Sequence, residues 1–183
     1  MNSQNKIILI TGATSGIGLS LTEIYLKDGW TVIGIGRKIT LLKSLRDLYL
    51  EKLIIVQCDL SKKENIGETF KNILEKYPSL NSFILNAGIY KTDDFDTFTE
   101  ESIEETFNIN LLSVYRSLLG IRNRLKEPNQ SLIAIVSSVA GYRGLPKSIS
   151  YRPTKAALIN LAEALKVDTA KYQVDVKLIC PGF

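Results

Sequence analysis

Histidine is absent from the 183-residue sequence, and cysteine occurs only at Cys58 and Cys180. Without histidine there is no Ser-His-Asp triad and little to bind a transition metal, so we expect no metal site. Both cysteines lie in apolar runs, which favours free, buried thiols. Free thiols are typical of a reducing compartment, and we therefore expect a cytoplasmic protein.

Long apolar segments and blocks of like charge are also missing. No segment reaches the roughly 20 apolar residues of a membrane helix, and the N-terminus does not resemble a signal peptide. The net charge is +4, with basic and acidic residues interspersed. No recognition helix or aromatic platform accompanies this charge, so we expect neither a nucleic-acid nor a membrane partner.

Short apolar runs rich in Ile, Val and Leu alternate with segments of helical spacing. The runs are Lys6–Ile10, Thr31–Ile35, Leu53–Gln57, Ser82–Leu85, Leu132–Val136 and Val174–Ile179. Continuous apolar runs predict strands buried on both faces, as in a parallel sheet. With right-handed crossovers, we expect one α/β domain over residues 1–183, with a doubly wound, Rossmann-type sheet of strand order 3-2-1-4-5-6.

Local signals predict helices between these runs, over about residues 17–28, 61–77, 100–124 and 150–171. Ser61 and Glu64 have the spacing of a capping box, which predicts the start of the second helix. Pro153 falls in the first turn of the last helix, where its missing N–H costs little. No linker, repeat or low-complexity stretch divides the chain.

The first apolar run ends in a glycine-rich turn that leads into a helix, with the sequence Thr11-Gly12-Ala13-Thr14-Ser15-Gly16-Ile17-Gly18. Gly12 permits a tight turn, Gly16 allows close approach of a pyrophosphate, and Gly18 allows close packing of the helix. The free N–H groups of the helix N-terminus attract phosphate, and Thr14 and Ser15 add hydroxyl donors. A glycine-rich turn without a function is the alternative interpretation.

The second apolar run ends in Gly36-Arg37-Lys38, without a carboxylate. An acid at this position would accept hydrogen bonds from the ribose of NAD, whereas a basic residue holds the 2′-phosphate of NADP. Arg37 can bind a phosphate with its planar fork, and Lys38 adds charge. We therefore expect NADP(H) in preference to NAD(H), with ordinary surface cations as the alternative.

Tyr151 and Lys155 are four residues apart on a predicted helix and share one face. Lowering a tyrosine pKa from about 10 to about 7 requires roughly 4 kcal/mol. An ammonium group about 4 Å away supplies a similar amount at an effective dielectric constant near 20. The pair therefore predicts a tyrosine general acid or base, although such pairs also occur by chance on helix surfaces.

Several further motifs follow in order along the chain. Ser138 lies at the end of the fifth run, thirteen residues before Tyr151, and its hydroxyl can stabilise charge on a substrate oxygen. Ser137 is the alternative. Asn110 is a polar amide in an apolar helix and needs hydrogen-bond partners there. The remaining motifs are Asn86-Ala87-Gly88 after the fourth run and Pro181-Gly182 after the sixth.

Together these motifs resemble the short-chain dehydrogenase/reductase family, through the glycine spacing of TGATSGIG, the Asn-Ala-Gly and Pro-Gly motifs, and the Ser-Tyr-Lys spacing. The resemblance implies a catalytic set of Ser138, Tyr151, Lys155 and Asn110, in which Asn110 holds a water that links the lysine to solvent. A structural amide is the alternative for Asn110. The implied cofactor-binding residues are Gly12, Thr14, Ser15, Gly16, Ile17, Gly18, Arg37, Lys38, Asp59, Asn86, Ala87, Gly88, Tyr151, Lys155, Pro181 and Gly182.

The activity implied by this resemblance is hydride transfer between NADP(H) and a carbonyl or alcohol substrate. Two features depart from the family: Arg152-Pro153-Thr154 replaces its usual residues between Tyr151 and Lys155, and the chain ends at Phe183, without the family's C-terminal substrate-binding part. A non-catalytic NADPH-binding sensor or scaffold is therefore the alternative. The resemblance also implies a homodimer formed through the helices that contain Asn110 and Tyr151.

Overall fold

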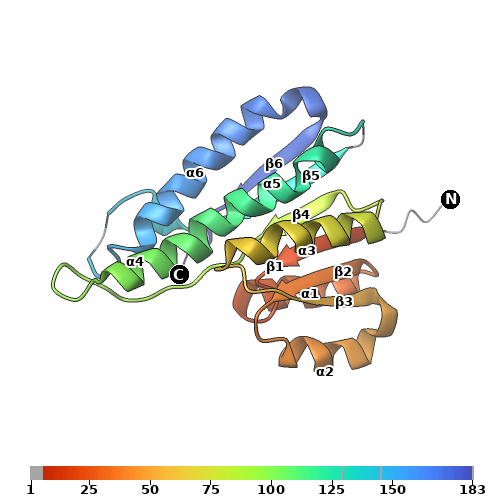
Figure 1. Cartoon of the computed structure of the whole chain (residues 1–183), viewed down its shortest axis with the longest axis horizontal. Coiled ribbons are helices and arrows are strands. Elements are labelled where there is room, and N and C mark those ends of the chain that lie inside the picture. Colours follow the sequence, from red (N-terminus) through yellow and green to blue (C-terminus); the bar gives the residue numbers. More distant parts are fainter. Residues whose placement is uncertain (1–5, 129, 145, 183) are drawn as a thin grey trace.

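The computed structural model describes residues 6–128, 130–144 and 146–182, and Met1–Asn5, Asn129, Leu145 and Phe183 lie outside the described residues. Six parallel strands form one sheet in the order β3-β2-β1-β4-β5-β6, with helices on both faces (Figure 1). The strands are β1 (Ile7–Thr11), β2 (Thr31–Gly36), β3 (Leu53–Gln57), β4 (Ser82–Leu85), β5 (Ser131–Val136) and β6 (Val174–Ile179). The predicted fold class and strand order are confirmed.

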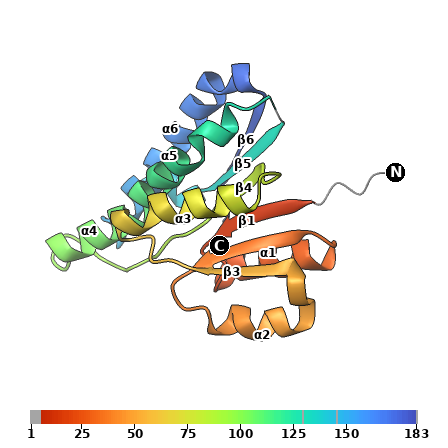
Figure 2. The same cartoon turned by 45° about the vertical axis from the view of Figure 1, so that its right-hand side comes forward.

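The helices alternate with these strands along the chain (Figure 2). They are α1 (Gly16–Lys27), α2 (Thr40–Tyr49), α3 (Lys63–Lys76), α4 (Glu100–Phe107), α5 (Ser113–Leu125) and α6 (Tyr151–Asp168). The predicted helix over 100–124 has a π-helical middle, Asn108–Leu112, which joins α4 to α5. Within the described ranges, no helix is long and apolar enough to span a bilayer.

The sheet separates two apolar cores because successive side chains of a strand point to opposite faces. In β1, Leu9 packs into the core formed with α3, α5 and α6, whereas Ile8 and Ile10 pack into the core formed with α1 and α2. Every residue of β1 is buried, as is typical of a central parallel strand. The two layers hold the carboxyl ends of the strands at one edge of the sheet.

One local prediction from the sequence is wrong, and two local features were not predicted. Ser61 does not cap α3, because its hydroxyl donates to Asp59 Oδ1 at 2.7 Å, and Lys62 occupies the N-cap position without a side-chain bond. Helix α2 was not predicted, since its ends carry no capping side chain. A capping box that was not predicted forms instead at the start of α4, between Thr99 and Ser102.

The last strand, β6, is buried on one face only, contrary to the prediction from its apolar run. Val174 and Val176 are buried in the core that includes α6. Asp175 and Lys177 are exposed on the opposite face and form an ion pair at 2.9 Å. The strand therefore alternates apolar and polar positions, the pattern of a half-buried strand.

Candidate functional site

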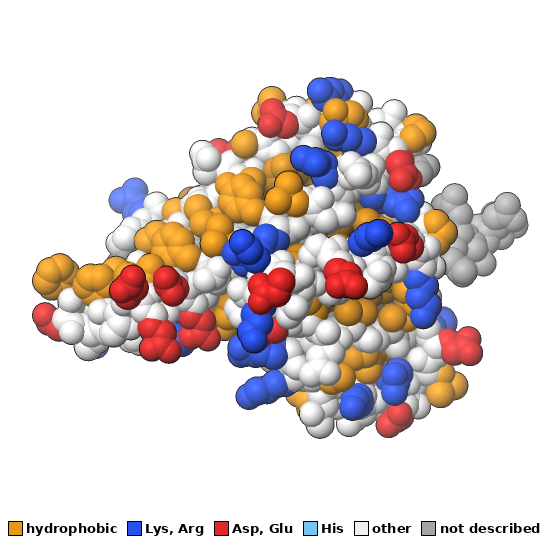
Figure 3. Space-filling view, in the orientation of Figure 1, with side chains coloured by type: hydrophobic (Ala, Val, Ile, Leu, Met, Phe, Trp, Pro, Cys, Tyr) orange, Lys and Arg blue, Asp and Glu red, His pale blue; other side chains and the backbone are white. Residues whose placement is uncertain are grey.

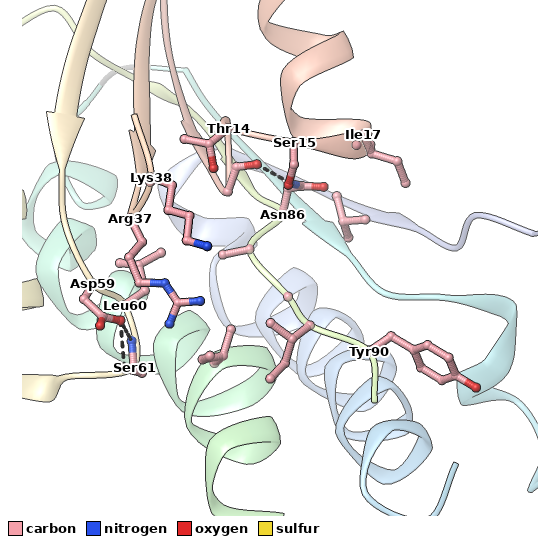
Figure 4. Close-up of a pocket in the computed structure, with 18 of the residues that line it drawn as sticks. Thr14, Ser15, Ile17, Arg37, Lys38, Asp59, Leu60, Ser61, Asn86 and Tyr90 are labelled. Atoms are coloured by element: carbon pink, nitrogen blue, oxygen red, sulfur yellow. Dashed lines mark hydrogen bonds between the residues drawn. The ribbon is translucent and has the colours of Figure 1, made fainter. Parts of the chain in front are cut away.

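A cavity of about 680 Å³ lies at the carboxyl ends of the strands, where doubly wound sheets bind their ligands (Figure 4). It is lined by most of the residues that the sequence singled out: Gly12, Thr14, Ser15, Gly16, Ile17, Arg37, Lys38, Asp59, Asn86, Ala87, Gly88, Tyr151 and Lys155. Five others are not among the lining residues: Gly18, Asn110, Ser138, Pro181 and Gly182. These five lie behind or beside the cavity wall, as described below.

The glycine turn after β1 has the geometry that a close-packed anion site needs. Gly12 and Gly16 adopt φ values of +66° and +50°, which favour glycine. A Cβ on Gly18 would lie 2.1 Å from the Gly12 carbonyl oxygen, so this glycine lets α1 pack against the turn itself. Ser15 is the N-cap of α1 and makes no side-chain cap bond, which leaves the N–H groups of the first turn without that partner.

A pair of polar residues joins this turn to the end of β4. Asn86 donates from Nδ2 to the carbonyl oxygens of Thr11 and Gly12, at 3.1 and 3.4 Å. The Thr11 hydroxyl oxygen accepts from the backbone N–H groups of Asn86 and Ala87, at 2.9 and 3.1 Å. Asn86 therefore braces the glycine turn, and Thr11 is a site residue that the sequence analysis missed.

Two cationic side chains lie at the end of β2. The side chains of Arg37 and Lys38 extend toward the interior of the cavity (Figure 4). Neither forms an ion pair within the described part of the chain. Gly36 precedes them, and a Cβ there would lie 2.3 Å from Thr14 Cγ2, so the glycine leaves room for Thr14 in the cavity wall.

Asp59 lines the cavity beyond these cations. Its Oδ1 accepts from the backbone N–H and hydroxyl of Ser61, at 3.0 and 2.7 Å. Partial burial raises the pKa of Asp59, but the bonds from Ser61 and the charge of Arg37 outweigh it and hold the pKa below its usual value. The carboxylate is therefore ionised near neutral pH, and its Oδ1 is hydrogen-bonded within the local turn.

At the other end of the cavity, Lys155 is buried, with 4% of its surface exposed. Its ammonium donates to the carbonyl oxygen of Val136 at 3.1 Å and lies 5.5 Å from the centroid of the Tyr151 ring. Burial lowers the pKa of Lys155 to about 8, because desolvation disfavours the charged form. The lysine is thus held beside the tyrosine in surroundings that disfavour its charged form.

The Tyr151 phenol lies between Ser138 and Tyr90. Burial raises the pKa of Tyr151, and a hydrogen bond with Ser138 lowers it. The Tyr90 ring packs edge-on, with centroids 5.0 Å apart and an interplanar angle of 83°. The expected lowering of the Tyr151 pKa toward 7 by Lys155 is not found, because burial dominates and the groups that lower the pKa are Ser138 and Arg152. A raised pKa keeps the phenol protonated at neutral pH.

The two serines at the end of β5 have different surroundings. Ser137 is buried and donates its hydroxyl proton to the carbonyl oxygen of Lys155 at 2.8 Å. Ser138 is the serine bonded to Tyr151, and its oxygen also accepts from the backbone N–H of Ala140 at 3.1 Å. The structure thus brings Ser138, and not Ser137, to the phenol.

Asn110 lies in the π-helical segment and is fully buried. Its Oδ1 accepts from the backbone N–H of Ile89 at 2.7 Å, and its Nδ2 donates to the Ile89 carbonyl oxygen at 2.9 Å and to Thr154 Oγ1 at 3.3 Å. A Cβ on Gly88 would lie 3.4 Å from Asn110 Oδ1 and 3.5 Å from Lys155 Nζ. The amide therefore holds the segment after β4 against α6, which is the role of a structural amide. It also lies close to the lysine.

The Pro181-Gly182 motif lies beside the turn that follows Ser138. The backbone N–H of Val139 donates to the Pro181 carbonyl oxygen at 3.1 Å.

Cys180 and Cys58 are both free thiols, but only Cys58 is buried. Cys180 is half-buried and accepts a hydrogen bond from the Tyr142 hydroxyl at 3.4 Å. The expectation of two buried thiols is therefore correct for Cys58 alone.

Two further residues contact the segment before α6. Asp93 is a buried acid bonded to Ser150, directly before Tyr151, and no motif in the sequence signals it. Arg152, the first of the three residues that depart from the family between Tyr151 and Lys155, bonds Ser148 Oγ at 3.0 Å and the carbonyl oxygen of Arg143 at 3.0 Å. It ties down the loop before α6.

Over the residues that the structure describes, no cluster of acids and cysteines could hold a metal ion.

Comparison with known proteins agrees with this geometry. The sequence profile of the short chain dehydrogenases matches residues 6–183. A 3beta-hydroxysteroid dehydrogenase from Mediterraneibacter gnavus is 33% identical over 182 residues, covering 97% of this chain and 65% of that protein. A short-chain dehydrogenase from Streptomyces avermitilis superposes with a TM-score of 0.93 at 26% identity, covering 99% of this chain and 66% of that one. ElxO with NADP bound superposes with a TM-score of 0.90 at 28% identity, covering 98% of this chain and 74% of that one.

The chain spans about two thirds of the length of the first two of these relatives. The match nevertheless runs from the first strand to the Pro-Gly motif and includes every element that forms the cavity. Sequence profile, strand order and cavity position agree, and this chain belongs to the short-chain dehydrogenase family.

Proposed function

We propose that this oxidoreductase transfers hydride between NADP(H) and a carbonyl or alcohol substrate, with Tyr151 as the general acid or base. The observation that carries the proposal is that a phenol and an ammonium line one cavity, with a serine hydroxyl beside the phenol. Tyr151 is bonded to Ser138, and Lys155 Nζ lies 5.5 Å from its ring centroid. A positioned proton donor beside a redox cofactor is what carbonyl reduction requires.

The residues around the cavity fit a dinucleotide phosphorylated at the ribose. The open space beside Gly16 and the N-terminus of α1 suit a pyrophosphate. Arg37 and Lys38 support NADP(H), because they line the cavity without a neighbouring carboxylate on β2 and without an ion pair within the described ranges. ElxO, at 28% identity, binds NADP.

The protein residues supply protons and orientation. When bound, NADP(H) supplies or accepts the hydride. The raised pKa keeps Tyr151 protonated at neutral pH, which suits proton donation to a carbonyl oxygen. The Ser138 hydroxyl stabilises charge on that oxygen. Lys155 and Asn110, whose Nζ and Oδ1 both lie within 3.5 Å of where a Cβ on Gly88 would be, support proton resupply from solvent.

The decisive experiment is NADPH oxidation with a panel of aldehydes, ketones and quinones. We expect wild-type protein to reduce at least one of them, and Tyr151→Phe to bind NADPH normally but lose turnover by at least about a hundredfold, the scale of general acid catalysis. Lys27→Met, an exposed change at the far end of α1, serves as the control. Turnover retained in Tyr151→Phe contradicts the acid role, and NADPH binding without any turnover favours the sensor or scaffold.

Cofactor preference is tested by Arg37→Ala. We expect the affinity for NADPH to fall about tenfold or more, since an ion pair with a phosphate is lost, while the affinity for NADH stays the same. Fluorescence titration with each cofactor measures both constants. Arg46→Ala, at the last turn of α2, is the matched control. An equal loss for NADPH and NADH contradicts the assignment.

We also propose that the chain forms a homodimer through the helices that contain Asn110 and Tyr151. Exposed apolar side chains gather on the face drawn in Figure 3. Leu112, Tyr115 and Leu119, which are 39%, 45% and 63% exposed, form one stripe at helical spacing from the end of the π-helical segment into α5. Such a stripe is typical of a protein-protein interface.

For the cellular compartment, we propose the cytoplasm. The observation behind this proposal is the pair of free thiols, Cys58 and Cys180. Free thiols persist where the surroundings are reducing.

A further inference from the structure

A buried carboxylate lies outside the cofactor cavity, at the start of α6. Asp93, in the loop between β4 and α4, has 3% of its surface exposed. Burial of an acid is costly unless it is well bonded. Both oxygens of Asp93 accept from the backbone N–H of Ser150, at 3.2 Å each, and Oδ2 also accepts a short hydrogen bond from the Ser150 hydroxyl.

The backbone around Asp93 is joined to the same segment. Asp93 and Ser148 form a parallel β-bridge, and the N–H of Ile149 donates to the Asp93 carbonyl oxygen at 3.4 Å. Nearby, the Tyr90 hydroxyl donates to the carbonyl oxygen of Lys147 at 3.4 Å. The loop after β4 and the loop before α6 are therefore tied together at several points.

These bonds act on the residue that directly precedes the phenol. Tyr151 is the first residue of α6, and Ser150, its N-cap, makes no side-chain cap bond within the helix. The first turn of α6 contains no acidic residue. Asp93 therefore supplies from another loop both the hydrogen-bond acceptor and the negative charge that favour a helix N-terminus.

We propose that Asp93 is a positioning residue for Tyr151: its buried carboxylate fixes the first turn of α6 and so directs the phenol to Ser138. This inference rests on the proposed function, since it assigns Asp93 a part in the proton transfer of Tyr151. Asp93 touches neither the cavity nor the phenol itself and acts through Ser150. Without it, the first turn shifts, and the phenol loses its packing against Tyr90 and its bond to Ser138.

The first test needs no substrate. The ionisation of Tyr151 is measured as the tyrosinate absorbance of each protein minus that of its Tyr151→Phe partner. Burial raises the pKa of Tyr151, and Tyr90 adds to this, while Ser138 and Arg152 lower it. In Asp93→Ala we expect the titration midpoint to fall toward about 10, the value of a solvated tyrosine, because the phenol becomes exposed.

Asp94→Ala is the matched control. Asp94 is half-buried, and its carboxylate accepts hydrogen bonds from the backbone N–H and the hydroxyl of Thr97 within its own turn. We expect no change in the Tyr151 midpoint in this variant. An unchanged midpoint in Asp93→Ala, or an equal change in both variants, overturns the proposal. If Asp93→Ala does not fold, Asp93→Asn and Ser150→Ala each remove part of the same contact and must lower the midpoint by a smaller amount; no change in both overturns it.

The second test uses any carbonyl compound that the wild type reduces. We expect Asp93→Asn to lower kcat about tenfold or more, since small displacements of a reacting group are costly, while KM and the affinity for NADPH change less than about twofold. A purely structural role would lower the unfolding temperature and leave kcat unchanged, which contradicts the proposal. If Tyr151→Phe keeps its turnover, the proposed function fails, and the phenol titration still decides the role of Asp93 in placing Tyr151.

Discussion

At the scale of single residues, the site contains a charge that opposes folding. Lys155 is buried, and its pKa is lowered from 10.5 to about 8 by desolvation. The folded protein therefore binds a proton less tightly at this site than the unfolded chain does. The resulting loss of folding stability is complete below pH 8 and disappears as the pH rises to 10.5. This group therefore makes the free energy of unfolding increase between these two pH values.

Replacing this lysine by an apolar side chain of similar length is expected to stabilise the protein. Lys155→Met should raise the free energy of unfolding at pH 7 by about 1–3 kcal/mol, somewhat less than the full pKa shift implies, because Val136 loses its donor. The gain should shrink above pH 8 and vanish near pH 10.5. Urea unfolding over this pH range measures it, with the exposed Lys166→Met as control. A gain that does not depend on pH contradicts the assigned pKa.

At the scale of elements, the cavity wall depends on glycines that let segments approach closely. Gly36 in β2 accommodates Thr14 of the turn after β1, and a Cβ at this position would lie 2.3 Å from Thr14 Cγ2. The end of the second strand and the glycine turn after β1 are therefore in direct contact. A glycine in α3, Gly67, is exposed and has no atom within 4 Å of its Cβ position.

This contrast predicts opposite effects of the same substitution. Gly36→Ala should lower the free energy of unfolding by about 1–3 kcal/mol because Thr14 is displaced. Adding Thr14→Ala should recover part of that loss, as expected for residues in contact. Gly67→Ala should stabilise by about 0.5–1 kcal/mol, since alanine is the better helix former. Denaturant unfolding of wild type, the single variants Gly36→Ala, Thr14→Ala and Gly67→Ala, and the double variant measures this, and strict additivity of the Gly36 and Thr14 changes contradicts the contact.

At the scale of the whole molecule, the two faces of the sheet differ in what they leave exposed. The face of α3, α5 and α6 carries the apolar stripe Leu112, Tyr115 and Leu119. The opposite face includes α2, where Leu48 is 77% exposed. A stripe of exposed apolar side chains favours association. Leu41 of α2 is also exposed, at 56%, but it lines the cavity, so Leu48 is the exposed leucine on this face that serves for comparison.

We therefore expect Leu119→Glu to shift the protein from dimer to monomer, because a charge in the centre of an apolar interface is costly to bury. Leu48→Glu, the same change on the other face, should leave the assembly unchanged. Sedimentation velocity over a range of protein concentrations distinguishes the two. A wild-type protein that is monomeric throughout, or a Leu119→Glu dimer of unchanged affinity, contradicts the proposed interface.

The sequence by itself was sufficient for the strand order and for most of the cavity wall. Apolar periodicity and glycine spacing are local properties, and the backbone of Gly12 and Gly16 shows the positive φ angles that such a turn requires. Arg37 could likewise be placed in the cavity from its position at the end of a strand. These predictions succeed because connection rules determine where the carboxyl ends of parallel strands lie.

Tertiary structure alone decided the partners of polar groups. The Ser61 hydroxyl binds Asp59 instead of capping α3, because both options are open to it and spacing does not choose between them. The raised pKa of Tyr151 follows from burial, which depends on segments distant in sequence. The bond between Asp93 and Ser150 joins loops 57 residues apart and exists only once the sheet has brought them together. Local sequence determines where chains turn, and packing determines which groups then lose water.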